Sequence, residues 1–295
     1  PAVAWAAAPA APAHAPEPAG PLAAKAFFTK PALGVASLSP SGRYLAVTRS
    51  TGKDKDATTD VVVYDQQTHE GHSVYAVKGE QLRFDWLKWK ADDRLLIGLS
   101  RGYAGSIGGF TMVVDFGQFI VAVDRQGGHP VVLMHEDAQA AKQAGTAAAL
   151  LDPLKADPDH ILAIASAPGG VLGVWKADVR TGAAVLIEKG DADTTSWDVD
   201  AQANIVVRYR STGRAFSIDG RGPGESAWNE IVRLKKKDFH ELPDFEVFGP
   251  AQKPGQLYVL VAPKTAAEGE TRTVHIYDFG TRTLGPAVWP ALKTE

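Results

Sequence analysis

The sequence contains no cysteine. Disulfides, thiolate metal sites, cysteine nucleophiles and thiol redox switches are therefore excluded. An excess of one charge is also lacking, because 31 Lys and Arg residues stand against 34 Asp and Glu residues, which gives a net charge of −3. This balance argues against a strongly basic nucleic-acid-binding protein. No run reaches the roughly 18 apolar residues of a membrane-spanning helix, and helical periodicity is almost absent.

The composition that remains is that of a globular protein. The chain has 295 residues, of which 45% are hydrophobic and 22% are charged. These values are ordinary for folded domains and exclude a wholly disordered or collagen-like chain. A length of this size corresponds to one large domain or two ordinary ones, with enough residues to bury a sizeable core.

The first 22 residues differ from the rest of the chain. They are almost entirely Ala and Pro, and the first acidic residue is Glu17. The apolar run at residues 3–8, followed by small residues at Ala13 and Ala15, is typical of the end of a secretory signal peptide whose basic beginning is missing. A disordered Pro/Ala linker is the alternative. Either way, we expect residues 1–22 to lie outside the fold and residues 23–295 to form it.

Short β-branched runs separated by turn residues dominate the body of the chain, which indicates strands and turns. Five similar hairpin units recur, each with a polar turn followed by a strongly apolar strand. They occupy residues 38–47, 89–97, 154–164, 197–207 and 248–259. Equivalent positions in them are Leu45, Leu96, Leu162, Val206 and Tyr258, at spacings of 51, 66, 44 and 52 residues. This is close to the period of roughly 40–50 residues of β-propeller blades.

A third strand that ends in or near an Asp follows each of these hairpins, and a turn and a fourth strand come next. The aspartates are Asp65, Asp124, Asp178, Asp219 and Asp278. Asp is favoured at the first position of such turns. Repeated units of four antiparallel strands predict an all-β fold, a β-propeller with about five blades, which forms an incomplete ring. A two-sheet β-sandwich is the rival fold. Residues 102–117 are expected to be a flexible Gly-rich insertion in the second blade, and residues 137–151 could form one short helix.

Three stretches resemble the start of bacterial serine peptidases of the prolyl-oligopeptidase (S9) family. The first stretch, Phe27-Phe28-Thr29-Lys30-Pro31 and then residues 35–46 with Ser39-Pro40-Ser41-Gly42, is similar to the opening of their first blade. Residues 89–96 resemble their second blade, and Asp124-Arg125-Gln126-Gly127-Gly128 resembles a turn that they share. The resemblance covers nearly all of residues 26–283.

This resemblance implies an exported propeller, periplasmic or secreted, whose partner is a C-terminal α/β-hydrolase domain with a Ser-Asp-His triad. That domain is absent from the sequence, so the expectation is a non-catalytic fragment that controls the access of peptide substrates, with no nucleic-acid partner and no membrane span. TolB-like propellers share the Ser-Pro-Ser-Gly hairpin, so a stand-alone periplasmic binding or scaffold propeller is the alternative. A propeller metal hydrolase is a third possibility, which needs metal ligands that converge in a central channel.

Individual residues provide no catalytic, cofactor or metal site. The nearest match to a Gly-x-Ser-x-Gly nucleophile elbow is Ala104-Gly105-Ser106-Ile107-Gly108, which has Ala first and no helix-like segment after it. His69 and His72 have no recognisable third ligand. The remaining histidines that we considered show no ligand spacing; they are His129, His135, His160, His240 and His275.

Other polar and aromatic motifs receive structural interpretations. Residues 220–224 lack the Lys-Ser/Thr of a phosphate loop and are predicted to form a turn. The lysines at 235–237 are expected to protect a strand edge. Glu225 and Glu230 match no amine-binding motif and remain unassigned. Five tryptophans are expected to pack between blades; they are Trp86, Trp89, Trp175, Trp197 and Trp228.

Overall fold

The computed structural model describes residues 33–52, 58–78, 82–107, 110–134, 148–235, 245–261 and 272–289. For residues 102–107 and 110–117 it describes the backbone alone. All these residues belong to one unit, which begins at Leu33.

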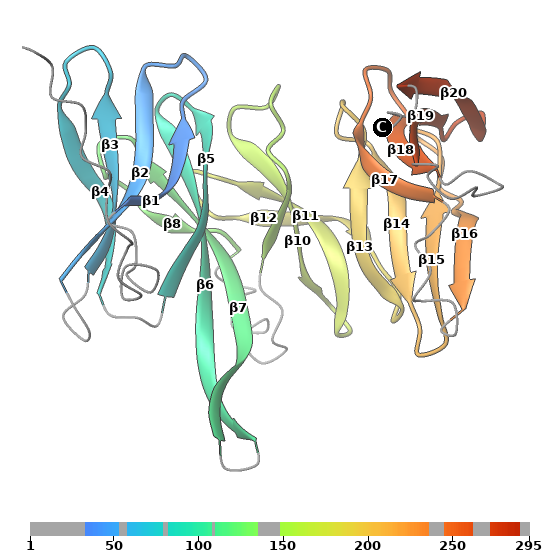
Figure 1. Cartoon of the computed structure of the whole chain (residues 1–295), viewed down its shortest axis with the longest axis horizontal. Helices are drawn as coiled ribbons and strands as arrows, with labels where there is room; N and C mark the ends of the chain where they lie inside the picture. The colour runs from blue at the N-terminus through green and yellow to red at the C-terminus, as the bar shows by residue number, and fades with distance from the viewer. Residues whose placement is uncertain are drawn as a thin grey trace, which may run out of the picture. The chain divides into compact units, whose positions relative to one another are not determined.

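The chain forms five four-stranded antiparallel sheets in sequence order, which we call blades 1 to 5 (Figure 1). Blade 1 contains β1 (Leu33–Leu38), β2 (Tyr44–Thr51), β3 (Thr58–Asp65) and β4 (Gly71–Lys78). Blade 2 contains β5 (Leu82–Ala91), β6 (Arg94–Ile107), β7 (Phe110–Asp124) and β8 (Val131–Val132). Blade 3 contains β9 (Ala149–Asp152), β10 (His160–Ala167), β11 (Val171–Asp178) and β12 (Ala184–Lys189). Blade 4 contains β13 (Thr194–Val199), β14 (Ile205–Ser211), β15 (Ala215–Gly220) and β16 (Asn229–Lys235). Blade 5 contains β17 (Phe245–Pro250), β18 (Gln256–Val261), β19 (Thr273–Asp278) and β20 (Thr283–Trp289).

The repeated hairpins form because the turn residues satisfy their own backbone. In blade 1 the Ser39 N–H donates to the Tyr44 carbonyl at 2.8 Å, and the Ser39 hydroxyl accepts from the Tyr44 N–H at 3.2 Å. Gly42 adopts a φ of 75°, a conformation that glycine reaches without steric cost. The predicted hairpin therefore follows from local chemistry.

The aspartates after the third strands anchor the next turn, as predicted from their type. The carboxylates of Asp65, Asp178 and Asp278 accept backbone N–H groups two or three residues later, at 2.7–2.8 Å. Asp219 differs because it lies inside β15, where it accepts a hydrogen bond from Arg208 at 2.7 Å.

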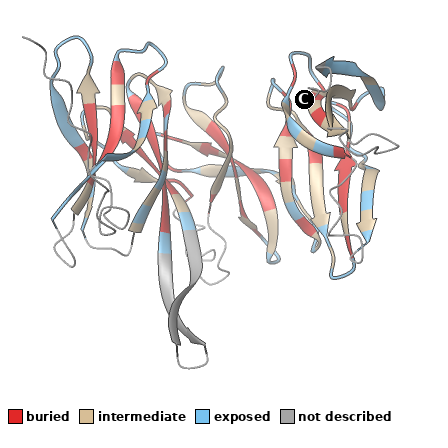
Figure 2. Cartoon of the chain, viewed as in Figure 1, coloured by how far each residue is buried: buried red, intermediate tan, exposed pale blue. Residues whose placement is uncertain are grey.

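The inner strands bury both faces, which is why they read as continuous apolar runs (Figure 2). In β6, Leu95 and Ile97 join a buried cluster with blade 1, whereas Leu96 between them joins a cluster with blade 3. This alternation follows from the two-residue period of a strand. Two further clusters join blade 3 to blade 4 and blade 4 to blade 5.

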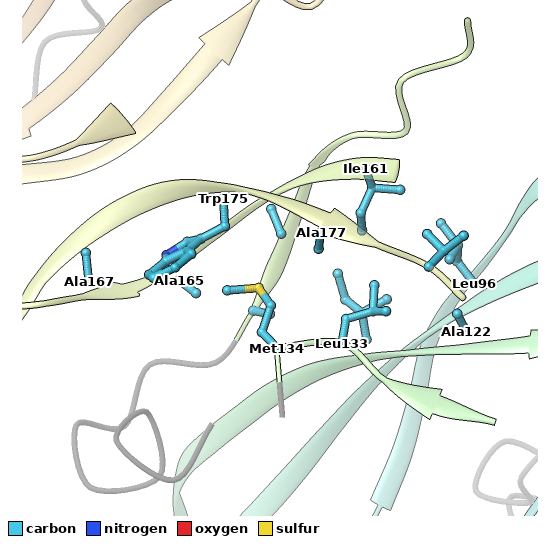
Figure 3. Packing of buried hydrophobic residues seen from close by; sticks show 13 residues of the cluster. Leu96, Ala122, Leu133, Met134, Ile161, Ala165, Ala167, Trp175 and Ala177 are labelled. Atoms are coloured by element: carbon cyan, nitrogen blue, oxygen red, sulfur yellow. The ribbon is translucent and has the colours of Figure 1, made fainter. Parts of the chain in front are cut away.

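The cluster between blades 2 and 3 shows how these interfaces pack (Figure 3). Small residues of β10, Ala163 and Ala165, leave space for the indole of Trp175 and the thioether of Met134. All five tryptophans predicted to pack between blades do so. Trp89 lies in the cluster between blades 1 and 2, and Trp86 and Trp175 contribute to the cluster between blades 2 and 3. Trp197 lies in the cluster between blades 3 and 4, and Trp228 packs against it.

One expectation about local structure was wrong, and a second was wrong at its C-terminal end. Residues 102–107 and 110–117 are not a loop, because they extend β6 and β7 into a long ladder that pairs Arg101 with Gly117 and Ile107 with Phe110. The suggested helix at 137–151 is replaced at its end by β9, which covers Ala149–Asp152. Residues 137–147 lie outside the described part of the chain, and no helix occurs among the residues that the structure describes.

Candidate functional site

Ser106, the centre of the nearest nucleophile-like motif, lies within β6. Its backbone pairs with Thr111 of β7 in a regular antiparallel ladder. A nucleophile elbow requires a sharp strand-to-helix turn that exposes the serine. The backbone around Ser106 therefore has the wrong geometry for that role, and Gly108 lies outside the described residues.

The histidines are engaged by separate parts of the fold. His72 Nε2 lies 2.9 Å from the Arg125 carbonyl of blade 2, and His69 lies in a turn with a φ of 60°. His160 Nδ1 contacts Asp157 at 2.9 Å, and His129 Nδ1 contacts Asp124 at 3.0 Å. No group of three or more potential metal ligands occurs within the described ranges, and His135 and His240 lie outside them.

The predicted turn at residues 220–224 is present at the end of β15. The Gly222 N–H donates to the Glu225 carboxylate at 3.0 Å, so the group that a phosphate would need is already used. Glu225 also lies 3.6 Å from Arg282, and Glu230 pairs with Arg233 at 3.0 Å. Lys235 is exposed on the outer strand β16, whereas Lys236 and Lys237 lie outside the described residues.

A hydroxyl–imidazole pair on β19 was not found from the sequence. The Thr273 hydroxyl lies 2.8 Å from His275 Nε2, and His275 Nδ1 lies 2.9 Å from the Gly285 carbonyl. Because a carbonyl can only accept, Nδ1 carries the proton and Nε2 accepts from the threonine. A Thr-x-His pattern within a strand is the signal for such a pair, since both side chains share one face. Catalysis would also require oxyanion donors, and the contacts described for this pair provide none.

Charged side chains link the ends of neighbouring blades. Arg94 is buried and donates to the Val179 carbonyl of blade 3 at 2.5 and 3.0 Å, and to Asp124 at 2.7 Å. Asp200 of blade 4 accepts the Gly255 N–H of blade 5 at 2.6 Å. Asp92 of blade 2 accepts the Ser41 N–H of blade 1 at 3.1 Å. These bonds hold successive hairpins at fixed positions.

Other carboxylates have their pKa lowered by cationic neighbours. The Arg43 guanidinium lowers the pKa of Asp65 to about 2 through a bond at 2.8 Å. Lys176, at 2.8 Å, and then His160 lower the pKa of Asp157 well below its usual range. These aspartates therefore remain ionised at neutral pH and are structural anions rather than general acids.

One carboxyl behaves in the opposite way. Asp198 on β13 accepts the Tyr209 hydroxyl of β14 at 2.5 Å. Burial raises the pKa of Asp198, and the tyrosine bond only partly opposes this effect. Burial, followed by the charge of Asp198, raises the pKa of Tyr209 far above its usual value. Tyr209 stacks on Phe216 at a ring distance of 6.2 Å, which fixes the hydroxyl toward the carboxyl.

A cavity of about 540 Å³ lies between blades 3 and 4. Its apolar lining includes Leu154, Leu162 and Ile205. Its charged lining includes Arg221, which pairs with Glu188 at 2.9 Å and lies 4.1 Å from the centre of the Trp228 ring. Sequence reasoning missed this cavity because its lining comes from segments far apart along the chain. The lining contains no nucleophile that is paired with a base.

Comparisons with known proteins identify the architecture. No family model and no curated protein matches the sequence. A solved prolyl endopeptidase aligns with a TM-score of 0.54 and 14% identity over 88% of this chain. The chain has a β-propeller fold. Dipeptidyl peptidase 4 of Porphyromonas gingivalis aligns with a TM-score of 0.51 and 10% identity over 83% of the chain. These structural similarities show the fold, and the predicted all-β propeller class is confirmed.

The propeller spans only 36% of the prolyl endopeptidase and 37% of the dipeptidyl peptidase. Both are peptidases of the family that the sequence resembles, and the coverage is that of a propeller region within a longer protein. TolB of Acinetobacter baumannii aligns less well, over 85% of this chain and 52% of its own, at 12% identity and a TM-score of 0.41. The described residues contain no helix with the length and apolarity needed to cross a bilayer.

Proposed function

We propose that this propeller is the non-catalytic part of a serine peptidase of the prolyl-oligopeptidase type. The observation that carries the proposal is the match of the five blades to the two peptidases over little more than a third of their length. The hairpin motifs at residues 38–46 and 89–96 support it independently, because they resemble the opening blades of that family. A C-terminal α/β-hydrolase domain, the expected partner, would supply the Ser-Asp-His triad.

The propeller's role in this proposal is to restrict which substrates reach the hydrolase. In a closed ring of such blades, the central channel would exclude folded proteins by size and admit peptides. Hydrogen bonds between blade ends, such as those from Arg94 of blade 2 to the Val179 carbonyl of blade 3, favour such a role because they resist separation of the blades. In the complete peptidase, we expect rapid cleavage of short peptides and slow cleavage of a folded protein that contains the same bond. Equal rates for the two substrates would contradict the gating role.

The gene itself provides the direct test. A reading frame that continues past the Glu295 codon to a Gly-x-Ser-x-Gly elbow, and then to Asp and His, is the expected result. A stop codon at that point would overturn the proposal in favour of a stand-alone binding propeller. In parallel, the purified chain should not hydrolyse peptide esters. Hydrolysis that is lost in the Ser106→Ala variant would contradict the non-catalytic role.

Export to the periplasm or the medium is a separate proposal, supported only by the composition of residues 1–22. A fusion of the gene's natural start through residue 32 to a reporter enzyme that is active only outside the cytoplasm tests it. Reporter activity is expected, and its absence would contradict export.

A further inference from the structure

The outer strands of the blades differ in how they protect their free edges. On β16 the exposed side chains are charged, namely Glu230, Arg233 and Lys235. The exposed side chains of β4 are small or polar, β8 has only two residues, and β20 is interrupted by Pro286. Charge, shortness, proline and β-bulges are among the usual means by which proteins prevent pairing at an edge.

Along its middle β12 has neither a proline nor an exposed charge, although its register with β11 is irregular at Ile187, between the pairs Val174–Glu188 and Trp175–Leu186. Val185 and Ile187 are 66% and 50% exposed, and the one cation, Lys189, is at the end of the strand. Within the described residues, β12 pairs with β11 alone. Its other edge therefore presents N–H and C=O groups together with two exposed β-branched side chains.

The exposed stripe on β12 continues into an interface that the structure establishes. Leu186 points toward blade 2 and packs on the cluster shared with it. Ile187, on the opposite face, lines the cavity between blades 3 and 4 together with Leu162 and Ile205. The latter two residues also belong to the apolar cluster that joins these blades. An added strand would therefore extend an apolar contact that already exists.

The charges beside this stripe are already paired. Arg221 binds Glu188 at 2.9 Å, and Lys176 binds Asp157 at 2.8 Å. A charged ligand side chain would have to break one of these pairs, because a buried charge without a partner is costly. An uncharged side chain leaves these pairs intact, and its apolar atoms can contact Leu154, Leu162 and Ile205 of a lining that also contains polar residues.

We propose that β12 binds an extended peptide segment by strand addition, with an apolar side chain of that segment in the cavity between blades 3 and 4. Main-chain hydrogen bonds would provide the affinity, and the pocket for alternate side chains would provide the specificity. Ile187 and Glu188 both line the cavity, because the register of β12 is irregular at this point, so a peptide residue paired beside Ile187 places its side chain toward the cavity. The proposal does not depend on a hydrolase domain, so it can hold whether the reading frame continues past the Glu295 codon or stops there.

The test uses a fluorescent peptide of alternating Val and Thr with a Lys at each end, and its binding to the full chain is measured by anisotropy. A second peptide, N-methylated at alternate residues on one edge, cannot pair along that edge. We expect the first peptide to bind and the second to bind at least tenfold more weakly. No binding of the first peptide at millimolar concentration, or equal binding of both, would overturn the proposal.

Two matched variants locate the site. Ile187→Lys places a charge on the exposed stripe and should weaken binding at least tenfold. Ala76→Lys introduces the same charge at an exposed position of the outer strand β4 and should leave binding unchanged. Val185→Lys, at the more exposed position, replaces Ile187→Lys if that variant does not fold. Equal effects at β4 and β12 would overturn the assignment.

A second copy of the chain is the other possible occupant of the β12 edge, and sedimentation of the chain alone tests it. We expect a monomer whose state does not change in Ile187→Lys. A concentration-dependent dimer that this variant abolishes would show that a second copy occupies β12, and would overturn the proposal of a peptide ligand.

Discussion

Among the residues whose burial the structure describes, Arg94 is the largest charged side chain that is completely buried, and its exposure is 1%. Its guanidinium contacts the carbonyls of Val179 and His129 and the carboxylate of Asp124, so it joins the hairpin of blade 2 to blade 3. Substitution Arg94→Met retains much of the volume but leaves these acceptors without a donor. Because removal of one partner leaves the other buried and uncompensated, we expect a loss of about 3 kcal/mol in the free energy of unfolding, measured in urea.

The control for this prediction is Arg43→Met. Arg43 pairs with Asp65 at 2.8 Å, but its side chain is 42% exposed, so water can replace the lost bond. We expect little change in the urea midpoint. Similar losses for the two variants would show that burial does not determine the strength of these pairs.

The raised pKa of Asp198 leads us to expect that the stability of the fold depends on pH. Burial raises its folded-state pKa above the unfolded value, so the folded state holds the proton more tightly. This contribution is complete below the unfolded pKa, roughly 4, and is lost as pH rises through the raised folded value. Asp198→Asn keeps an oxygen that can accept from Tyr209 and cannot ionise. The variant should therefore gain stability relative to the native chain as pH rises from 4 to 7.

Urea unfolding across this range checks the prediction. Tyr209→Phe is the control, because it removes the hydroxyl that favours the ionised carboxyl and should make the native dependence on pH steeper. A constant difference between Asp198→Asn and the native chain at all pH values would contradict the assignment to Asp198.

At the scale of elements, the extension of β6 and β7 is separable from blade 2. Leu99 and Ile120 are buried and lie on either side of the extension. We expect that replacing residues 101–117 with Asn-Gly, which closes a two-residue hairpin between Ser100 and Gln118, changes the melting temperature by only a few degrees. The comparison is Leu99→Ala, a cavity-forming change at 1% exposure that should cost about 2–5 kcal/mol. A deletion as destabilising as Leu99→Ala would show that the extension supports the blade.

The sequence predicted elements wherever the determining chemistry is local. The turn at Ser39 and Gly42 and the aspartate caps at Asp65, Asp178 and Asp278 depend on neighbours within a few residues, so repeated residue types were sufficient. The extension at 102–117 was misjudged because glycine content suggested a loop. The ladder forms there because the strand returns directly onto its partner, a relation that composition does not contain.

Side-chain sites were less predictable because they depend on residues brought together from different blades. The sequence gives no indication that Glu188 will meet Arg221, 33 positions later, or that Asp200 will accept the Gly255 N–H, 55 positions later. Only the tryptophans were placed correctly between blades, because their area makes burial at an interface favourable in any blade arrangement. The cavity beside β12 follows from the same long-range contacts.

At the scale of the whole chain, the four buried clusters connect each blade to the next in sequence order. Stability should then behave as in repeat proteins, as a sum of blade terms and nearest-neighbour interface terms. A change at one interface should loosen the two blades that share it and leave more distant blades unaffected. Trp197 is suited to this test because it is 1% exposed and packs with Leu162 and Val174 between blades 3 and 4.

We expect Trp197→Ala to cost about 3–5 kcal/mol and to speed hydrogen exchange at amides of β10, β11 and β14, with no change in β2 and β3 of blade 1. Trp197→Phe should cost less, because it fills much of the space and removes a buried N–H that has no hydrogen-bond partner among the described residues. Hydrogen exchange followed by mass spectrometry resolves the blades separately. Faster exchange in all five blades would mean that the propeller unfolds as one cooperative unit, and the nearest-neighbour description would then be wrong.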